Sequence, residues 1–283
     1  MERVSSGNQA PLAFQHYVAL GDSMSIDLYP SLDLRSRYQM HLLEDVGAAT
    51  LLHCNADWLW PAFQGLDLRS LCPGIRHSNL TMDGATTAGV LEYQLPAMPK
   101  SDGGPALITL TVGGNDLLRM MFDDAKQGRR ELPLLIERLR RIVDGILASY
   151  DDALLLVGTV YDPSDGQMHL GDGVVLPDGF AWLTEYNDAV RRLAERERCR
   201  VADIHRHFFG HGLATEASAE RWYWEVSIIE PGALGASEVR RVWLDCLGVR
   251  SAPEAGSAAE ADAVTRRHTV GSRAKRGYGR EDP

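Results

Sequence analysis

The sequence predicts an α/β fold, in which parallel strands are joined by crossover helices. Short apolar runs of strand length alternate along the chain with longer segments of helical periodicity, and this alternation is typical of such units. Several of the apolar runs end in glycine-containing turns, which favours buried strands feeding tight loops. No run of eighteen uncharged apolar residues is present, so we expect a soluble protein without stable membrane insertion.

The expected strands are compact and rich in apolar or β-branched residues. They cover residues 16–20, 75–82, 106–112, 153–160 and 199–204. The expected helices show amphipathic spacing and cover residues 32–46, 86–95, 131–149, 180–197 and 235–247. Two segments without clear periodicity, 48–74 and 161–179, are expected to form irregular loops that shape the site.

The length and composition predict one domain with an appended tail. A chain of 283 residues buries a good core, and we place the domain at 1–250 and a disordered tail at 251–283, because the tail has almost no large apolar residues. The net charge of −10 argues against a nucleic-acid partner. Four scattered cysteines and an N-terminus without the features of a secretory signal favour a reduced, cytoplasmic protein.

Three polar motifs follow predicted structural elements and together suggest chemistry. Ser23 ends the turn Gly21-Asp22-Ser23 after the first strand, where a serine N–H and its hydroxyl can point at the same space. Gly84 offers a backbone N–H at the start of a predicted helix, where the dipole favours negative charge. Asn115 offers a side-chain amide after a strand that ends in two glycines. Each motif alone is also compatible with an ordinary turn.

Taken in order, the motifs GDSMS, DGATT and VGGNDLL resemble the GDSL/SGNH family of serine esterases and lipases. The resemblance runs from about residue 17 to about residue 247 and implies a flavodoxin-like, three-layer α/β/α sandwich with a mostly parallel sheet. It also implies that Ser23 is the nucleophile and that the oxyanion is held by Ser23 N–H, Gly84 N–H and the Asn115 amide. The expected substrate is a small-molecule ester, and no cofactor or metal is expected.

The last motif of that family, D-x-x-H-P, is altered here to Ser227-Ile-Ile-Glu230-Pro. Glu230 stands in the place of the histidine and Ser227 in that of the aspartate, which leaves the identity of the general base open. Glu230 is the preferred base. Its reference pKa lies about two units below that of histidine, a handicap of roughly 3 kcal/mol, but burial among neighbouring aromatic and aliphatic residues would remove much of that deficit.

Three other interpretations compete with a Glu230 base. The base is instead His205, His207 or His211, which follow a predicted strand. Alternatively, the machinery is degenerate and the protein binds an ester or acyl-like ligand without turning it over. A different class of function, a metal-dependent phosphoesterase, requires Asp203 and these histidines as ligands on an extended segment, where His-x-His side chains face one way.

Other conspicuous residues are expected to be structural. Asp22 and Asp116 are expected to brace the loops by accepting backbone N–H bonds. Trp58, Trp60 and Trp182 are candidates for the lining of an acyl or alcohol pocket, but large aromatic side chains more often belong to the core.

Overall fold

The computed structural model describes residues 12–38, 45–122, 125–167, 169–170, 174–175, 177–215 and 221–250, and a parallel sheet forms its centre. Five strands lie in the order β2-β1-β3-β4-β7, all parallel to their neighbours. Their bounds are β1 (His16–Gly21), β2 (Arg76–Asn79), β3 (Ala106–Thr111), β4 (Ala153–Gly158) and β7 (Cys199–Ala202). The strand order reverses direction between β1 and β3, and ligands of open α/β sheets bind outside the carboxyl ends of strands at such a point.

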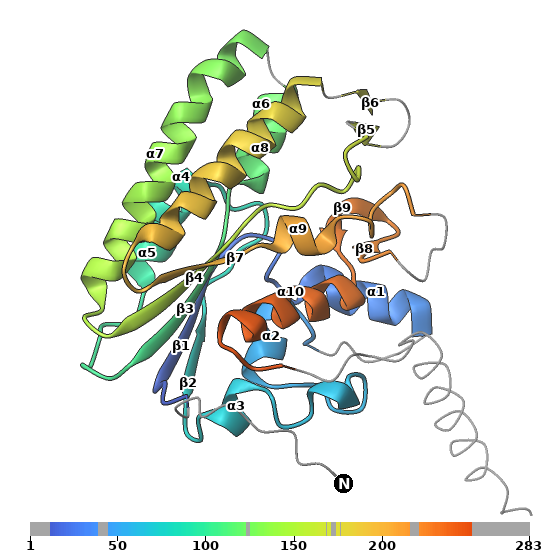
Figure 1. Ribbon diagram of the computed structural model, residues 1–283. Helices are drawn as coiled ribbons and strands as arrows, with labels where there is room; N and C mark the ends of the chain where they lie inside the picture. Colours follow the sequence, from blue (N-terminus) through green and yellow to red (C-terminus); the bar gives the residue numbers. More distant parts are fainter. Residues whose placement is uncertain are drawn as a thin grey trace, which may run out of the picture.

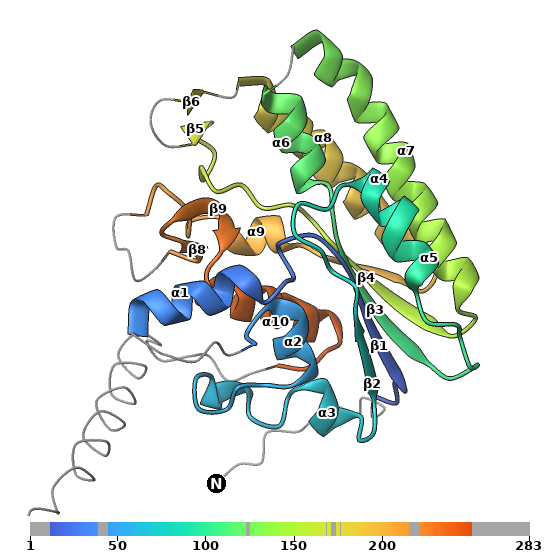
Figure 2. The same cartoon turned by 180° about the vertical axis from the view of Figure 1, so that it is seen from behind.

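Helices cover both faces of the sheet and complete a three-layer α/β/α sandwich (Figures 1 and 2). One face carries α1 (Leu28–Tyr38), α2 (Ala48–His53), α3 (Leu68–Leu71), α9 (Ile204–Phe208) and α10 (Ala233–Cys246). The other carries α4 (Thr87–Gly89), a π-helical turn (Val90–Gln94), α5 (Leu95–Ala97), α6 (Gly114–Phe122), α7 (Ala125–Ser149) and α8 (Pro177–Arg192). The predicted α/β class and sandwich architecture are confirmed.

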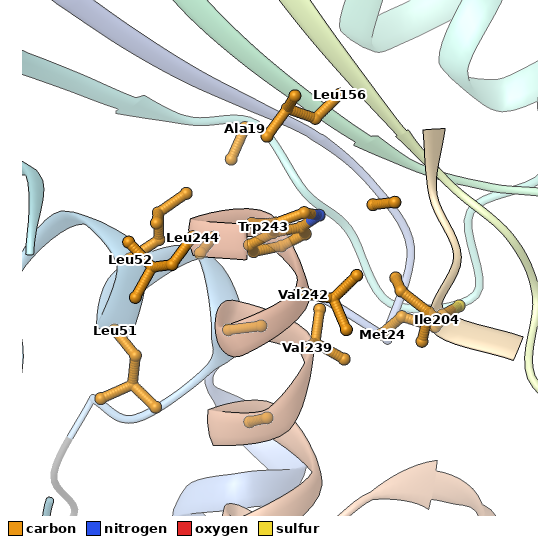
Figure 3. Packing of buried hydrophobic residues seen from close by; sticks show 14 of the residues in the cluster. Ala19, Met24, Leu51, Leu52, Leu156, Ile204, Val239, Val242, Trp243 and Leu244 are labelled. Carbon is orange, nitrogen blue, oxygen red and sulfur yellow. The ribbon is translucent and has the colours of Figure 1, made fainter. Parts of the chain in front are cut away.

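Alternation along the strands divides the core into two clusters. Tyr17 and Ala19 of β1 face the α10 side, whereas Val18 and Leu20 face the α7 side, as the period of two in a strand requires. On the first side, α10 directs the buried Trp243 against Ala19 of the sheet and toward α2 (Figure 3). Both faces of the sheet are therefore buried, which explains why its strands read as nearly continuous apolar runs.

The smaller elements lie outside the sheet. Two hairpins are formed, β5 (His169–Leu170) with β6 (Val174–Val175), and β8 (Tyr223–Trp224) with β9 (Ser227–Pro231). Short 3₁₀ turns cover Pro61–Phe63 and Leu193–Glu195. Within the described residues, no helix combines the length and the apolar character needed to cross a bilayer.

All five predicted strands are confirmed, but several predicted helices have different bounds. The helix expected at 32–46 begins at Leu28, and Asp45 and Val46 are not helical; residues 39–44 lie outside the described part. The helix expected at 131–149 begins six residues earlier, and α6, α9 and the β8–β9 hairpin were not predicted. The disordered tail expected at 251–283 lies outside the described residues.

Candidate active site

Ser23 lies in a tight turn that follows β1 directly. Gly21 has φ 132°, and a Cβ built on it would lie 2.0 Å from the backbone oxygen of Thr111. Only glycine fits there, because the left-handed backbone and the close approach of β3 both exclude a side chain. The Asp22 N–H donates to the same Thr111 oxygen at 2.9 Å. The neighbouring strand therefore sets the direction in which the chain presents Ser23.

A buried glutamine ties this turn to the segment that carries Gly84. The Gly21 N–H donates to Oε1 of Gln94 at 2.7 Å, and Nε2 of Gln94 donates back to the Gly21 oxygen at 2.8 Å. That oxygen also accepts the N–H of Met82 at 3.0 Å. The first two motifs are thus held together by three hydrogen bonds around one glycine.

Glu230 reaches Ser23 from the β8–β9 hairpin, which sequence patterns had not predicted. The Ser23 hydroxyl and the Glu230 carboxylate line the same cavity, and the interaction of Glu230 with Ser23 favours its ionised form. The hairpin is fixed by the Tyr161 hydroxyl, which donates to the Ile229 oxygen at 2.7 Å. At the start of α10, the Ala233 N–H donates to Asp33 of α1 at 2.9 Å.

Burial changes the acidity of Glu230. Glu230 is 8% exposed, and loss of solvation raises its pKa from 4.5 to about 7, although the interaction with Ser23 acts in the opposite direction. The nearby charge of Asp83 also raises the pKa. Oε2 of Glu230 has no hydrogen-bond partner among the described residues. A carboxylate with this pKa is as basic as an ordinary histidine.

Asp22 is a second buried carboxyl group beside Ser23. Desolvation raises its pKa to about 7, and the charge of Glu230 contributes in the same direction. Unlike Glu230, Asp22 is engaged with its own loop, because Oδ1 accepts the N–H of Met24 at 3.2 Å. The predicted bracing role of Asp22 is confirmed.

Asn115 stands in the first turn of α6, with its amide beside the glycine motif. Nδ2 donates to the oxygen of Ala85 at 3.0 Å, and since an amide nitrogen carries two N–H groups, one is left for a ligand. Gly84 is the residue before Ala85, in an exposed turn with φ 66°. Asn115 lines the same cavity as Ser23 and Glu230, whereas Gly84 is not part of the lining.

Asp116 braces the loops as predicted. Its carboxylate accepts the N–H and the hydroxyl of Thr87, both at 2.8 Å. Arg138 of α7 donates to the same hydroxyl at 2.8 Å. This network fixes the start of α4 against the start of α6, and thereby the position of Asn115.

The three candidate histidines lie apart from the nucleophile, and none lines its cavity. His207 Nε2 lies 2.8 Å from the Glu238 carboxylate, and His211 stacks on Trp222 with ring centroids 3.6 Å apart. His205 is half-buried, and desolvation lowers its pKa. These contacts assign the histidines to the packing around α9 and α10.

A metal site would require the segment 205–207 to be extended, but this segment is helical. His205 and His207 belong to the helix α9, in which residues two apart do not face each other. Asp203 caps this helix and pairs with Arg191 at 3.1 Å. In the described part of the chain, no cluster of three or more histidine, cysteine or acidic side chains is arranged to hold a metal ion.

Ser23, Asn115 and Glu230 open into one cavity of about 90 Å³. Its polar lining includes Ser23, Asp22 and Glu230, and α6 and α8 contribute apolar side chains. No lysine, arginine or histidine belongs to its lining within the described residues. An uncharged substrate fits this distribution better than an anion, which would meet two buried acidic groups.

One of the two expected specificity segments contributes to this cavity. Tyr161, Asp162, Pro163 and Ser164, as well as Gly179, belong to the lining, as expected for the segment 161–179. The expectation that 48–74 lies at the mouth was wrong, because none of its residues lines the cavity. This segment instead forms α2, a 3₁₀ turn and α3, packed against the α10 side of the core.

The tryptophans are not part of the cavity either. Trp60 and Trp182 are buried in opposite halves of the core, as their residue type favours, and Trp58 is partly exposed. The apolar lining from α6 and α8 was not predicted from the sequence. The spacing of Asn115, Leu118 and Met121, three residues apart, was the available signal, because it places them along one side of a helix.

Comparisons with known proteins show which family and which solved structures this chain resembles. A model of the "GDSL-like Lipase/Acylhydrolase family" matches residues 19–235, and no protein of curated function matches significantly in sequence. Among solved structures, an extracellular lipase from Streptomyces rimosus is 22% identical, covering 83% of this chain and 98% of that one with a TM-score of 0.55. The acetylxylan esterase Axe2 from Geobacillus stearothermophilus is 17% identical, with coverages of 85% and 98% and a TM-score of 0.55. At these identities, the two structures establish a shared fold.

Proposed function

The chain belongs to the GDSL-like lipase/acylhydrolase family, a family of carboxylic ester hydrolases, and from this premise we propose that it is a serine esterase in which Glu230 replaces the usual histidine. Ser23 is the nucleophile, and Glu230 is its general base. The substrate is a small-molecule ester. The four free cysteines support a reducing, cytoplasmic environment as part of the proposal.

The proposed reaction is a two-step acyl transfer. The Ser23 hydroxyl gives its proton to Glu230 while Oγ attacks the carbonyl carbon, and a tetrahedral oxyanion forms. Glu230 then returns the proton to the leaving alcohol oxygen as the C–O bond breaks, which leaves an acyl-enzyme. A water molecule gives a proton to Glu230 as it attacks the acyl carbon, and Glu230 then passes that proton to Ser23 Oγ as the acyl C–O bond breaks, which releases the acid and restores Ser23.

The observation that carries the proposal is that Ser23 shares one cavity with a buried carboxylate, Glu230, whose pKa is raised to about 7. An exposed glutamate would be too weak a base by roughly 3 kcal/mol in proton affinity relative to histidine. Burial removes this deficit, because the ionised carboxylate has lost much of its hydration.

The proposed oxyanion hole consists of the Ser23 N–H, the Gly84 N–H and the second N–H of Asn115. Asn115 supports this role because it lines the cavity beside Ser23. Gly84 contributes from the adjacent turn, whose Ala85 oxygen accepts the other N–H of Asn115. Such donors stabilise the charge that develops in the transition state.

A fluorophosphonate probe tests the assignment of the nucleophile, because it modifies only an activated serine. We expect the wild-type protein to be labelled, Ser23→Ala to remain unlabelled and Glu230→Gln to label at least 100-fold more slowly, in line with the usual size of general-base catalysis. Ser25→Ala is the matched control, since Ser25 is buried two residues away and bonds to Thr111. An unlabelled wild-type protein would support a binding protein instead of an enzyme.

A further inference from the structure

The apolar part of the active-site cavity, called the channel below, is lined by two helices. Asn115, at the start of α6, lines the cavity, and so do Leu118 and Met121 further along the same helix. The facing wall comes from Phe180 and Leu183 of α8. The side of the helix that presents the oxyanion donor therefore becomes apolar within one turn.

The helices α6 and α8 are in close contact where Met121 meets Gly179. A Cβ built on Gly179 of α8 would lie 2.9 Å from Sδ of Met121. Phe180, the next residue, is partly exposed. The helices α6 and α8 are therefore closely packed at this point, and a cavity of about 90 Å³ holds about six to nine groups of the size of a water molecule, at roughly 10–15 Å³ each.

The position of Glu230 identifies which part of an ester this channel receives. Glu230 comes from the hairpin next to α1 and α10, whereas α6 and α8 cover the opposite face of the sheet (Figure 1). The leaving alcohol must lie on the side of Glu230, because this residue donates the proton to its oxygen. The acyl group then points from the carbonyl carbon toward α6 and α8.

We propose that the channel between α6 and α8 is an acyl-binding site, and that this esterase selects uncharged esters with a linear aliphatic acyl chain of about four to six carbons. This inference rests on the proposed function and adds the substrate class to it. The similarity in fold to both a lipase and an acetylxylan esterase leaves that class open. An apolar channel contributes little to the binding of an acetyl group. Each further methylene that it buries should raise kcat/KM about fourfold.

Hydrolysis of 4-nitrophenyl esters of increasing acyl length tests the proposal. We expect kcat/KM to rise by on the order of 100-fold from acetate to hexanoate, from the cost of about 0.8 kcal/mol for each exposed methylene, and then to level off. Leu118→Trp fills the channel, and its hexanoate-to-acetate ratio should fall at least tenfold. The matched control is Arg119→Trp, which adds the same side chain at the next, exposed position of α6. Equal ratios in these two variants, or no preference in the wild type, would overturn the proposal.

Two further measurements separate this inference from the proposed function. Methyl hexanoate and hexyl acetate carry the long chain on opposite sides of the ester, and a preference for hexyl acetate would contradict the assignment to the acyl group. Binding of methyl hexanoate to Ser23→Ala, measured by calorimetry, does not depend on turnover. Binding that is lost on adding Leu118→Trp supports the channel even if the wild type proves inactive, whereas absence of binding refutes it.

Discussion

Ser23 and Glu230 meet in one cavity, but the segments that carry them are held in different ways. The turn of Ser23 is fixed by the backbone of β3 and by a buried glutamine that bonds Gly21 twice. Glu230 sits on a two-stranded hairpin outside the sheet, which is held by the pairing of its two strands, by the Tyr161 hydroxyl and, just after the hairpin, by Asp33. The nucleophile turn therefore depends on backbone geometry, which a short motif records. The position of the base depends on the hairpin that carries the altered last motif, and no local sequence pattern predicted that hairpin.

The largest effect is expected from removing the charge of the base. Glu230→Gln keeps the shape of the side chain but cannot accept the Ser23 proton, so kcat for ester hydrolysis should fall by about 10²- to 10⁴-fold. Glu225→Gln is the matched control, because Glu225 is an exposed carboxylate of the same hairpin. Steady-state kinetics that give equal rates for the two variants would exclude Glu230 as the base.

The stability of the protein gives a second readout of Glu230. The pKa of Glu230 is about 7 in the folded protein, compared with 4.5 for a glutamate outside this environment. The folded state therefore binds the proton more tightly than the unfolded state. The free energy of unfolding therefore falls as pH rises between these two values. Glu230→Gln should lose this part of the pH dependence, on the order of 3 kcal/mol, as measured by urea denaturation at several pH values.

The two supports of the site differ in their expected contribution to stability. Gln94→Leu leaves the buried N–H of Gly21 without a partner, and we expect a loss of about 2–3 kcal/mol in the free energy of unfolding. Tyr161→Phe removes only the bond to the Ile229 oxygen, which is partly accessible to water, and should cost about 1 kcal/mol. Denaturation curves that reverse this order would show that the hairpin, not the turn, is the more strongly held.

The smallest effect is expected at Gly84, the proposed oxyanion donor that does not line the cavity. Gly84→Ala perturbs a backbone N–H in a turn with φ 66°, and kcat should fall by about tenfold, a modest part of what a complete donor contributes. Gly74→Ala is a close control, with φ 85° and open space around it, at a site outside the cavity. Both changes should cost about 1 kcal/mol of stability. If kcat falls equally in both, Gly84 has no special role.

The same contrast explains what the sequence could predict. The strands and the loops that carry Ser23 and Asn115 follow from apolar runs and glycines, because close backbone approach leaves few alternatives to glycine. The burial of Glu230 was anticipated from its apolar neighbours, but the hairpin beneath it was not, since its strands have only two and five residues. The segment 48–74 was misplaced because its side chains pack on α10, a contact between residues distant in sequence.

The dependence of kcat/KM on pH tests the central claim, that a buried glutamate activates Ser23, most directly. Glu230 accepts a proton only when ionised, so the account predicts that kcat/KM of the wild type rises with pH through about 7, the raised pKa of Glu230. The residual activity of Glu230→Gln should lack that rise. A wild-type rate already at its plateau near the reference pKa of a glutamate, about 4.3, or an unchanged profile in Glu230→Gln, would contradict the account.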